Sequence, residues 1–185
     1  MRNHLVLMAV AMSLAAGTLF AVDAPKKSPV IPRKAAEFVF KMPDGSQQLL
    51  STYRGKTIVL AMMFTTCPHC QKTSQLLSKL QPEYASKGVQ VLGVVFDQGA
   101  ASRAKEFQKT YAPNFPIGSS EQGPVLEFLQ VPQTDPYFVP ILVFIDKRGT
   151  LHSQYIGDET FLNNQEVNIR AEIDKMLKAT AAPKS

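Results

Sequence analysis

The sequence predicts an α/β sandwich, in which a central mixed sheet is flanked by helices and preceded by an N-terminal β-hairpin. The continuous apolar run at residues 57–64 is too short for a helix and fits a strand buried on both faces. A second buried strand is expected at residues 89–96, and each of these strands precedes a segment with apolar residues at helical spacing. Alternating strands and helices of this kind are typical of an α/β domain.

The other elements are predicted from turn, capping and periodicity signals. The hairpin spans residues 38–50 and turns at Asp44 and Gly45. The remaining elements, in chain order, are a helix that ends before Gly88, a helix at 102–112 with Ser102 as its N-cap, a short strand at 115–117, a short helix at 124–129, strands at 141–145 and 151–156, and a helix at 166–177. The strands at 57–64 and 89–96 should be parallel, and the last two strands should be antiparallel to them or to each other.

Composition limits the classes of function. The chain has 185 residues, which suits one globular domain with additional segments at its ends. Hydrophobic residues make up 45% and charged residues 19%, as in an ordinary soluble domain. The net charge is +5, but the basic residues form no stripe that would follow a phosphate backbone, so nucleic acid is not expected as a partner.

The N-terminus has the pattern of an export signal. Arg2 precedes an almost wholly apolar stretch, and residues 1–24 are therefore predicted to be a cleaved signal peptide or a retained membrane anchor. Residues 25–35 are rich in proline and lysine and are predicted to be a linker. Lys26 and Lys27 within this linker suit an anionic membrane surface. We therefore expect an exported, periplasmic or otherwise extracytoplasmic protein, either free or anchored.

A Cys-x-x-Cys motif, Cys67-Pro68-His69-Cys70, follows the first buried strand and opens a helix. Unpaired N–H groups and the dipole at a helix start favour negative charge, so Cys67 is expected to be the exposed, reactive thiol. Cys70 follows one helical turn later, where the two sulfurs can meet. Pro68 pre-forms the first turn, and His69 supplies a cation or a hydrogen-bond donor beside the thiolate. These residue types predict a redox pair with a nucleophile, a resolving thiol and a tuning residue.

The two cysteines also allow uses other than redox chemistry. A disulfide between the two cysteines of the chain would close a very short loop and stabilise the fold little. Zinc needs four ligands, usually from two such pairs, so no metal site is predicted. Met62 and Met63 offer soft ligands for copper(I), although adjacent methionines on a buried strand are more often core residues. A copper(I) chaperone that uses the same cysteines is kept as the alternative function, whereas His152 is expected to be a surface residue.

Residues 36–177 resemble the thioredoxin superfamily, and within it the exported TlpA/ResA-like branch of thiol–disulfide oxidoreductases. The resemblance is carried by the hairpin, by an insertion between central strand and helix, and by the residues Thr66-Cys67-Pro68-His69-Cys70 and Val139-Pro140. It implies a thioredoxin-like domain at residues 36–180, with Cys67 as the attacking thiol and Cys70 as the resolving thiol. It also implies that Val139 and a cis Pro140 dock the substrate. Protein thiols or disulfides would be the substrates, a redox partner protein would be needed, and no bound cofactor is required.

The chain departs from this family pattern at informative positions. Thr66 stands where many members have tryptophan, and Ala61 stands where thioredoxin and DsbA have a buried acid, so the proton acceptor for Cys70 is unassigned. The Cys-Pro-His-Cys motif and Val139 resemble DsbA, an oxidant, whereas the overall outline resembles reductants, which leaves the direction of electron flow open. His69 is expected to raise the reduction potential by stabilising the reduced form. A peroxidase-like thiol enzyme is a third alternative, but no arginine lies near Cys67 in the sequence.

Overall fold

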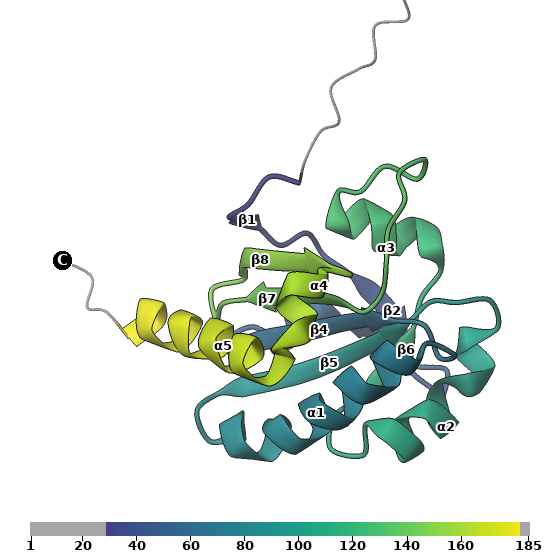
Figure 1. The fold of residues 1–185 in the computed structure, drawn as a ribbon, viewed down its shortest axis with the longest axis horizontal. Coiled ribbons are helices and arrows are strands. Elements are labelled where there is room, and N and C mark those ends of the chain that lie inside the picture. The colour runs from purple at the N-terminus through teal and green to yellow at the C-terminus, as the bar shows by residue number, and fades with distance from the viewer. Residues whose placement is uncertain (1–28, 182–185) are drawn as a thin grey trace, which may run out of the picture.

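The computed structural model describes residues 29–181, so the predicted signal or anchor at 1–24 and the first part of the linker lie outside the described residues. Within residues 29–181, eight strands form one mixed sheet in the order β1-β8-β7-β4-β5-β6-β2-β3 (Figure 1). The strands are β1 (Arg33–Lys34), β2 (Val39–Lys41), β3 (Gln47–Leu49), β4 (Thr57–Met63), β5 (Val89–Val95), β6 (Ile117–Ser119), β7 (Ile141–Ile145) and β8 (Thr150–Ile156). The helices are η1 (Leu50–Tyr53, 3-10), α1 (Pro68–Ala85), α2 (Ala100–Tyr111), α3 (Gln122–Leu129), α4 (Glu159–Asn163) and α5 (Gln165–Ala181).

The strand directions confirm the predicted mixed sheet. β4 and β5 are parallel over their whole lengths, from the Thr57–Val89 pair to the Met63–Val95 pair. β7 pairs antiparallel with β4, and β8 pairs antiparallel with β7. The predicted hairpin is present as β2 and β3, which pair antiparallel.

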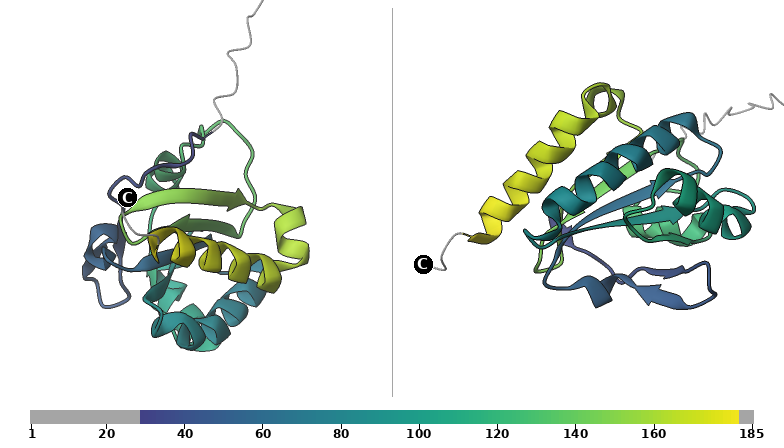
Figure 2. Two further views of the ribbon diagram at one scale, coloured as in Figure 1. Left: turned by 90° about the vertical axis from the view of Figure 1, so that its left-hand side faces the viewer. Right: turned by 90° about the horizontal axis from the view of Figure 1, so that it is seen from below.

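The sheet is buried on both faces, as the apolar run of β4 predicts. Its odd-numbered residues, such as Val59 and Met63, belong to a core cluster with side chains of α1, α2 and α5. Its even-numbered residues, such as Leu60 and Met62, face a second cluster built with α3 and the hairpin. Figure 2 shows α1 and α5 next to each other on one side of the sheet, with the hairpin on the other side. β4 is therefore a central, fully packed strand of the sheet, and the residues that follow it start from a fixed position.

α1 accommodates a proline in its interior. Pro82 has no N–H and so leaves the carbonyl of Ser78 without its helical donor. The side-chain amide of Asn114 donates to that carbonyl instead, at 2.9 Å. α1 thus runs unbroken from the cysteine motif to the turn before Gly88, where the φ angle of +80° favours glycine.

Several predicted boundaries differ from the observed ones, and two of the differences have an identifiable local cause. α2 begins at Ala100 with Gly99 at the N-cap position, so Ser102 is not the cap; its hydroxyl donates to the Gly99 carbonyl at 2.8 Å. The helix starts earlier because the turn after β5 already binds the Ala100 N–H to the Asp97 carbonyl at 2.8 Å. The strand predicted at 115–117 lies at 117–119, because Pro116 has no N–H for the ladder.

Three elements were not predicted: the short 3-10 helix η1, β1 and α4. Arg33 and Lys34, at the end of the predicted linker, form β1 and pair with Thr150 and Leu151 of β8. Asp158 caps α4 by accepting a hydrogen bond from the Phe161 N–H at 3.0 Å. In the described part of the chain, none of the helices combines the length and hydropathy that a membrane span requires.

Candidate functional site

Cys67 stands at the N-cap of α1, in extended backbone with φ −82° and ψ 118°. Its sulfur accepts a hydrogen bond from the Cys70 N–H at 3.3 Å. Pro68 occupies the first helical position, where a missing N–H costs nothing. The helix start therefore offers Cys67 Sγ a donor and a favourable dipole, and both stabilise a negative charge on sulfur.

The two thiols differ in exposure. Cys67 is partly buried, whereas Cys70 is 0% exposed, and both are free thiols in the structure. Burial raises the pKa of Cys70 strongly, and its hydrogen bond with Cys67 and the negative charge of Asp97 act in the same direction. Cys70 is thus a protonated, protected thiol, and Cys67 is the thiol that an incoming disulfide meets.

The predicted docking residues lie at this sulfur. Cys67 Sγ is 3.8 Å from the carbonyl oxygen of Val139, to which the thiol donates. The Val139–Pro140 peptide bond is cis, as predicted. Of the other residues in the motif, Pro68 and His69 are exposed, next to the half-buried Cys67. The structure therefore brings all six predicted site residues to one end of the sheet.

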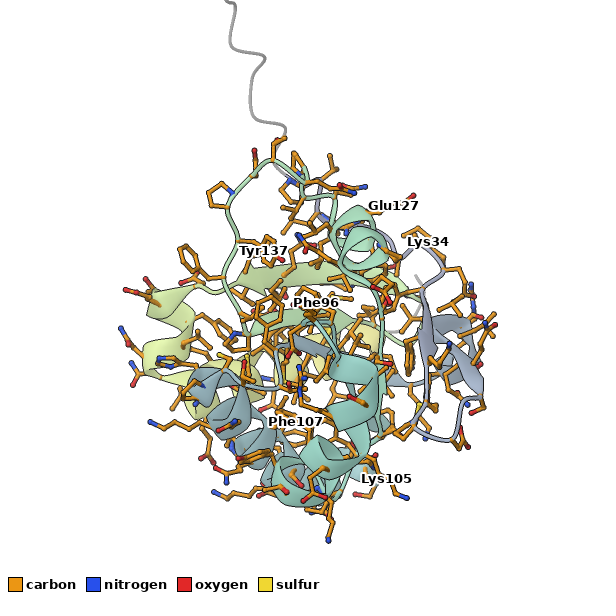
Figure 3. All side chains as sticks on the ribbon, turned by 90° about the vertical axis from the view of Figure 1, so that its right-hand side faces the viewer. Lys34, Phe96, Lys105, Phe107, Glu127 and Tyr137 are labelled. Carbon is orange, nitrogen blue, oxygen red and sulfur yellow. The ribbon has the colours of Figure 1, made fainter. Side chains whose placement is uncertain are left out.

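The segment before Pro140 adds an aromatic surface that was not predicted. Phe138 is 71% exposed, the highest value among the large hydrophobic side chains of the described residues. Tyr137 instead turns inward and stacks on Phe96, with ring centroids 6.1 Å apart (Figure 3). Phe138 also lies against Gly157, where a Cβ would come within 2.2 Å of the Phe138 Cβ. Glycine at 157 is what allows this close approach.

A charged group that was missed from the sequence lies directly behind the cysteine motif. The Asp97 carboxylate accepts hydrogen bonds from the N–H of Thr65 at 2.8 Å and from its hydroxyl at 2.6 Å. Arg103 pairs with the same carboxylate and donates from Nε to Thr65 Oγ1 at 2.7 Å. Although burial acts to raise the pKa of Asp97, the hydrogen bonds from Thr65 and Arg103 hold it below its usual range. Asp97 is therefore ionised at neutral pH.

These contacts include an arginine that is distant from the motif in the sequence. No arginine lies near Cys67 in the sequence, yet Arg103 reaches the segment just before it in space. Its guanidinium is engaged by Asp97 and by the Gln98 carbonyl. The available sequence signal was an acid and a glycine, Asp97 and Gly99, at the carboxyl end of a buried parallel strand, where α/β proteins place functional groups.

Other candidate residues lie elsewhere or have structural roles. Met62 and Met63 are fully buried, and Met63 Sδ accepts a hydrogen bond from Ser74 at 3.1 Å. His152 is not a simple surface residue, because its Nε2 lies 3.0 Å from the buried Asp146 carboxylate. That pair adjoins the Ile58–Ile145 end of the sheet, opposite the cysteines. Within residues 29–181, no three His, Cys, Asp or Glu side chains are grouped as a metal site would require.

The fold and the cysteine pair at the start of α1 define a thiol–disulfide oxidoreductase of the thioredoxin-like class. The chain belongs to the AhpC/TSA family, whose profile matches residues 31–154.

Individual relatives agree with this class. The thiol-disulfide oxidoreductase ResA of Bacillus thuringiensis subsp. konkukian (strain 97-27) is 27% identical over 130 residues, which are 70% of this chain and 72% of the relative. Two solved structures share the fold. A thiol:disulfide interchange protein of the thioredoxin family from Chlorobium tepidum TLS has a TM-score of 0.65 at 18% identity, over 81% of this chain and 99% of that one. BsSco, a member of the Sco family of cytochrome c oxidase assembly proteins, has a TM-score of 0.61 at 18% identity, over 82% and 97%.

The difference between the two thiols predicts their order of alkylation. In the reduced protein at neutral pH, iodoacetamide should modify Cys67 first. Cys70 should react at least about tenfold more slowly than Cys67, because each unit by which the pKa of Cys70 is raised removes about nine-tenths of its thiolate. Peptide mass spectrometry after timed quenching measures both rates, and the variants Cys67→Ser and Cys70→Ser give each thiol alone. Equal rates in the two single variants would contradict the assignment.

Proposed function

We propose that this enzyme exchanges disulfides with protein thiols outside the cytoplasm, through a mixed disulfide on Cys67. The observation that carries the proposal is the half-exposed Cys67 sulfur, which lies between a helix N-terminus and the Val139 carbonyl. A protein substrate suits this site because the surface around the sulfur, with exposed Pro68, His69 and Phe138, is open and partly apolar.

The exchange proceeds in two balanced steps. The Cys67 thiolate attacks one sulfur of a substrate disulfide, the substrate S–S bond breaks, and one substrate sulfur leaves as a thiolate. Cys70 then loses its proton and attacks Cys67 Sγ, which forms the Cys67–Cys70 disulfide and releases the second substrate thiolate. The reverse sequence oxidises a substrate dithiol. In either direction a redox partner protein must restore the starting state before the next turnover.

Val139 and Pro140 are proposed to dock the substrate chain. The Val139 carbonyl oxygen is 3.8 Å from Cys67 Sγ. A substrate whose backbone N–H binds this carbonyl would therefore hold the substrate's reacting cysteine close to Cys67. Export is supported by the signal-like residues 1–24 of the sequence and by the similarity to ResA. Lys26 and Lys27 would then lie near the membrane surface if residues 1–24 are retained as an anchor.

Copper(I) binding at Cys67 and Cys70 is the alternative function. Two thiols are suitable soft ligands, and the fold is shared with BsSco. Against a copper site, Met63 Sδ is already occupied by the Ser74 hydroxyl inside the core. Titration of the thiols with and without a copper(I) chelator separates the two functions, because disulfide exchange should not respond to the chelator.

Substitution of single cysteines tests the proposed roles. Cys70→Ser should accumulate a stable mixed disulfide between Cys67 and a substrate protein, because the resolving attack is lost. Cys67→Ser, the matched control, should trap nothing, because the remaining thiol is buried and protonated. Non-reducing gels with a disulfide-containing test protein such as insulin show the adduct. Adducts on Cys67→Ser but not on Cys70→Ser would reverse the roles and refute the mechanism.

His69 is proposed to make the couple more oxidising, and its exposed position beside Cys67 allows this without rearrangement of the core. His69→Ala should lower the reduction potential by about 30 mV, which is a tenfold change in the exchange equilibrium of a two-electron couple. Equilibration with glutathione redox buffers measures it, and Thr66→Ala, a change at another exposed residue of the same loop, serves as the control. An unchanged or higher potential in His69→Ala would remove His69 as the tuning residue.

A further inference from the structure

Three side chains close a ring of hydrogen bonds behind the cysteine motif. The Thr65 hydroxyl donates to Asp97 Oδ2 at 2.6 Å and accepts from Arg103 Nε at 2.7 Å. Arg103 Nη2 completes the ring by pairing with Asp97 Oδ2. Each polar atom of the ring is therefore bonded to another member of it, which is the condition under which a polar network in a protected place is stable.

The ring is largely shielded from solvent. Thr65 is 6% exposed and the Asp97 side chain is 12% exposed, whereas Arg103 is 43% exposed and forms its outer edge. Gly99 leaves space for the Arg103 guanidinium, because a Cβ at position 99 would lie 2.9 Å from Arg103 Nη1. A carboxylate with so little exposure gains much from its partner cation, and removal of that cation would leave a poorly solvated charge.

Thr65 connects the ring to the reacting sulfurs. It is two residues before Cys67, and its N–H, hydroxyl and carbonyl are all bonded. The N–H and hydroxyl bind Asp97, while the carbonyl accepts from Gln71 Nε2 at 3.1 Å, next to Cys70 at the start of α1. The segment that leads into the motif is thus fixed at each polar group of Thr65.

The charges around Cys70 are few. Cys70 lies in a core cluster of apolar side chains from the sheet, α1, α2 and α5. The titratable groups that act on it are Cys67, on the same helix, and Asp97, from the turn after β5. Arg103 pairs with the Asp97 carboxylate, and His69 is exposed in the first turn of α1.

We propose that Asp97 and Arg103 are positioning residues for disulfide exchange, which with Thr65 hold the segment before Cys67 and set the charge that acts on the resolving thiol of Cys70. This inference rests on the proposed two-step exchange, because it concerns the second step. Asp97 disfavours the Cys70 thiolate, and Arg103 limits that effect. The two residues therefore influence the thiolate in opposite directions, although they belong to one ring.

The opposite signs give a test that a merely structural role would fail. Reduced protein is mixed with dithionitrobenzoate, and release of coloured thionitrobenzoate is followed by stopped flow across a range of pH. The first phase reports attack by Cys67 on the reagent. The second phase reports attack by Cys70 on the mixed disulfide, and its pH midpoint reports the ionisation of the Cys70 thiol. Asp97→Asn should move the pH midpoint of the second phase down, and Arg103→Gln should move it up. A midpoint shift of one pH unit would change the rate below the midpoint by about threefold, because thiol nucleophilicity falls with pKa with a coefficient of about 0.5.

Conservative variants and a remote control make the result specific. Thr65→Ser keeps the hydroxyl and should keep the wild-type second phase, whereas Thr65→Val, of similar size, should slow it. Arg103→Lys keeps the charge and should shift the midpoint less than Arg103→Gln, which tests the sign even if Asp97→Asn does not fold. Arg170→Gln removes a guanidinium from ion pairs with Glu83 and Glu166, at the far end of α1, and should change nothing.

The outcomes separate this inference from the function on which it rests. Shifts of the same sign in Asp97→Asn and Arg103→Gln, or no shift in either, would overturn the positioning role while leaving disulfide exchange intact. A slower second phase in Asp97→Asn at every pH would also overturn it, and would make Asp97 the proton acceptor for Cys70. Loss of the second phase in the wild-type protein would contradict the proposed function itself.

Discussion

The structure depends on one constraint, which is that a strand buried on both faces must end where a helix begins. β4 is wholly buried between two core clusters, so its position is fixed by packing on either side. The chain leaves it at the rim of the sheet and enters α1 after four residues, 64–67. Cys67 is therefore delivered to a helix N-terminus, where the Cys70 N–H reaches its sulfur. The reactivity of the motif follows from this placement.

The same geometry makes the two cysteines unequal. One helical turn carries Cys70 from the rim into the core, where it has no exposed surface and its pKa is raised by burial. A thiol in that position is protected from alkylation and oxidation by reagents in solution, but it is also slow to act as a nucleophile. The enzyme therefore needs a means to control the charge near Cys70. Asp97 comes from the turn after β5 and Arg103 from α2, and both bind Thr65 rather than the cysteines.

The sequence contained most of the fold because the relevant signals are local. The apolar runs of β4 and β5, the turn at Asp44 and Gly45, and the motif at a strand–helix junction each depend on residues close together in the chain. The Asp97–Arg103–Thr65 ring could not be predicted in the same way. Asp97 and Thr65 are 32 residues apart, and only the parallel pairing of β4 with β5 brings their strand ends together. Ala61 leaves β4 without an acid behind the motif, and the carboxylate nearest to the motif in the structure, Asp97, comes from the turn after β5 and binds Thr65.

Errors at the element boundaries have similar causes. Ser102 is a good N-cap residue by type, but the backbone bond from the Ala100 N–H to the Asp97 carbonyl starts α2 two residues earlier. β1 consists of two polar residues and exists because β8 offers it a free edge, which no local pattern reveals. α4 did have a local signal, since Asp158 followed by Glu159 is a favourable helix start.

The most direct test of the central claim is a redox titration of the full-length protein against dithiothreitol or glutathione buffers, with free thiols counted by mass. A Cys67–Cys70 couple predicts that both thiols disappear together in one transition, with a slope of about 30 mV per tenfold change in the ratio of oxidised to reduced protein. Two separate one-thiol transitions, or accumulation of a glutathione adduct without the internal disulfide, would contradict the account.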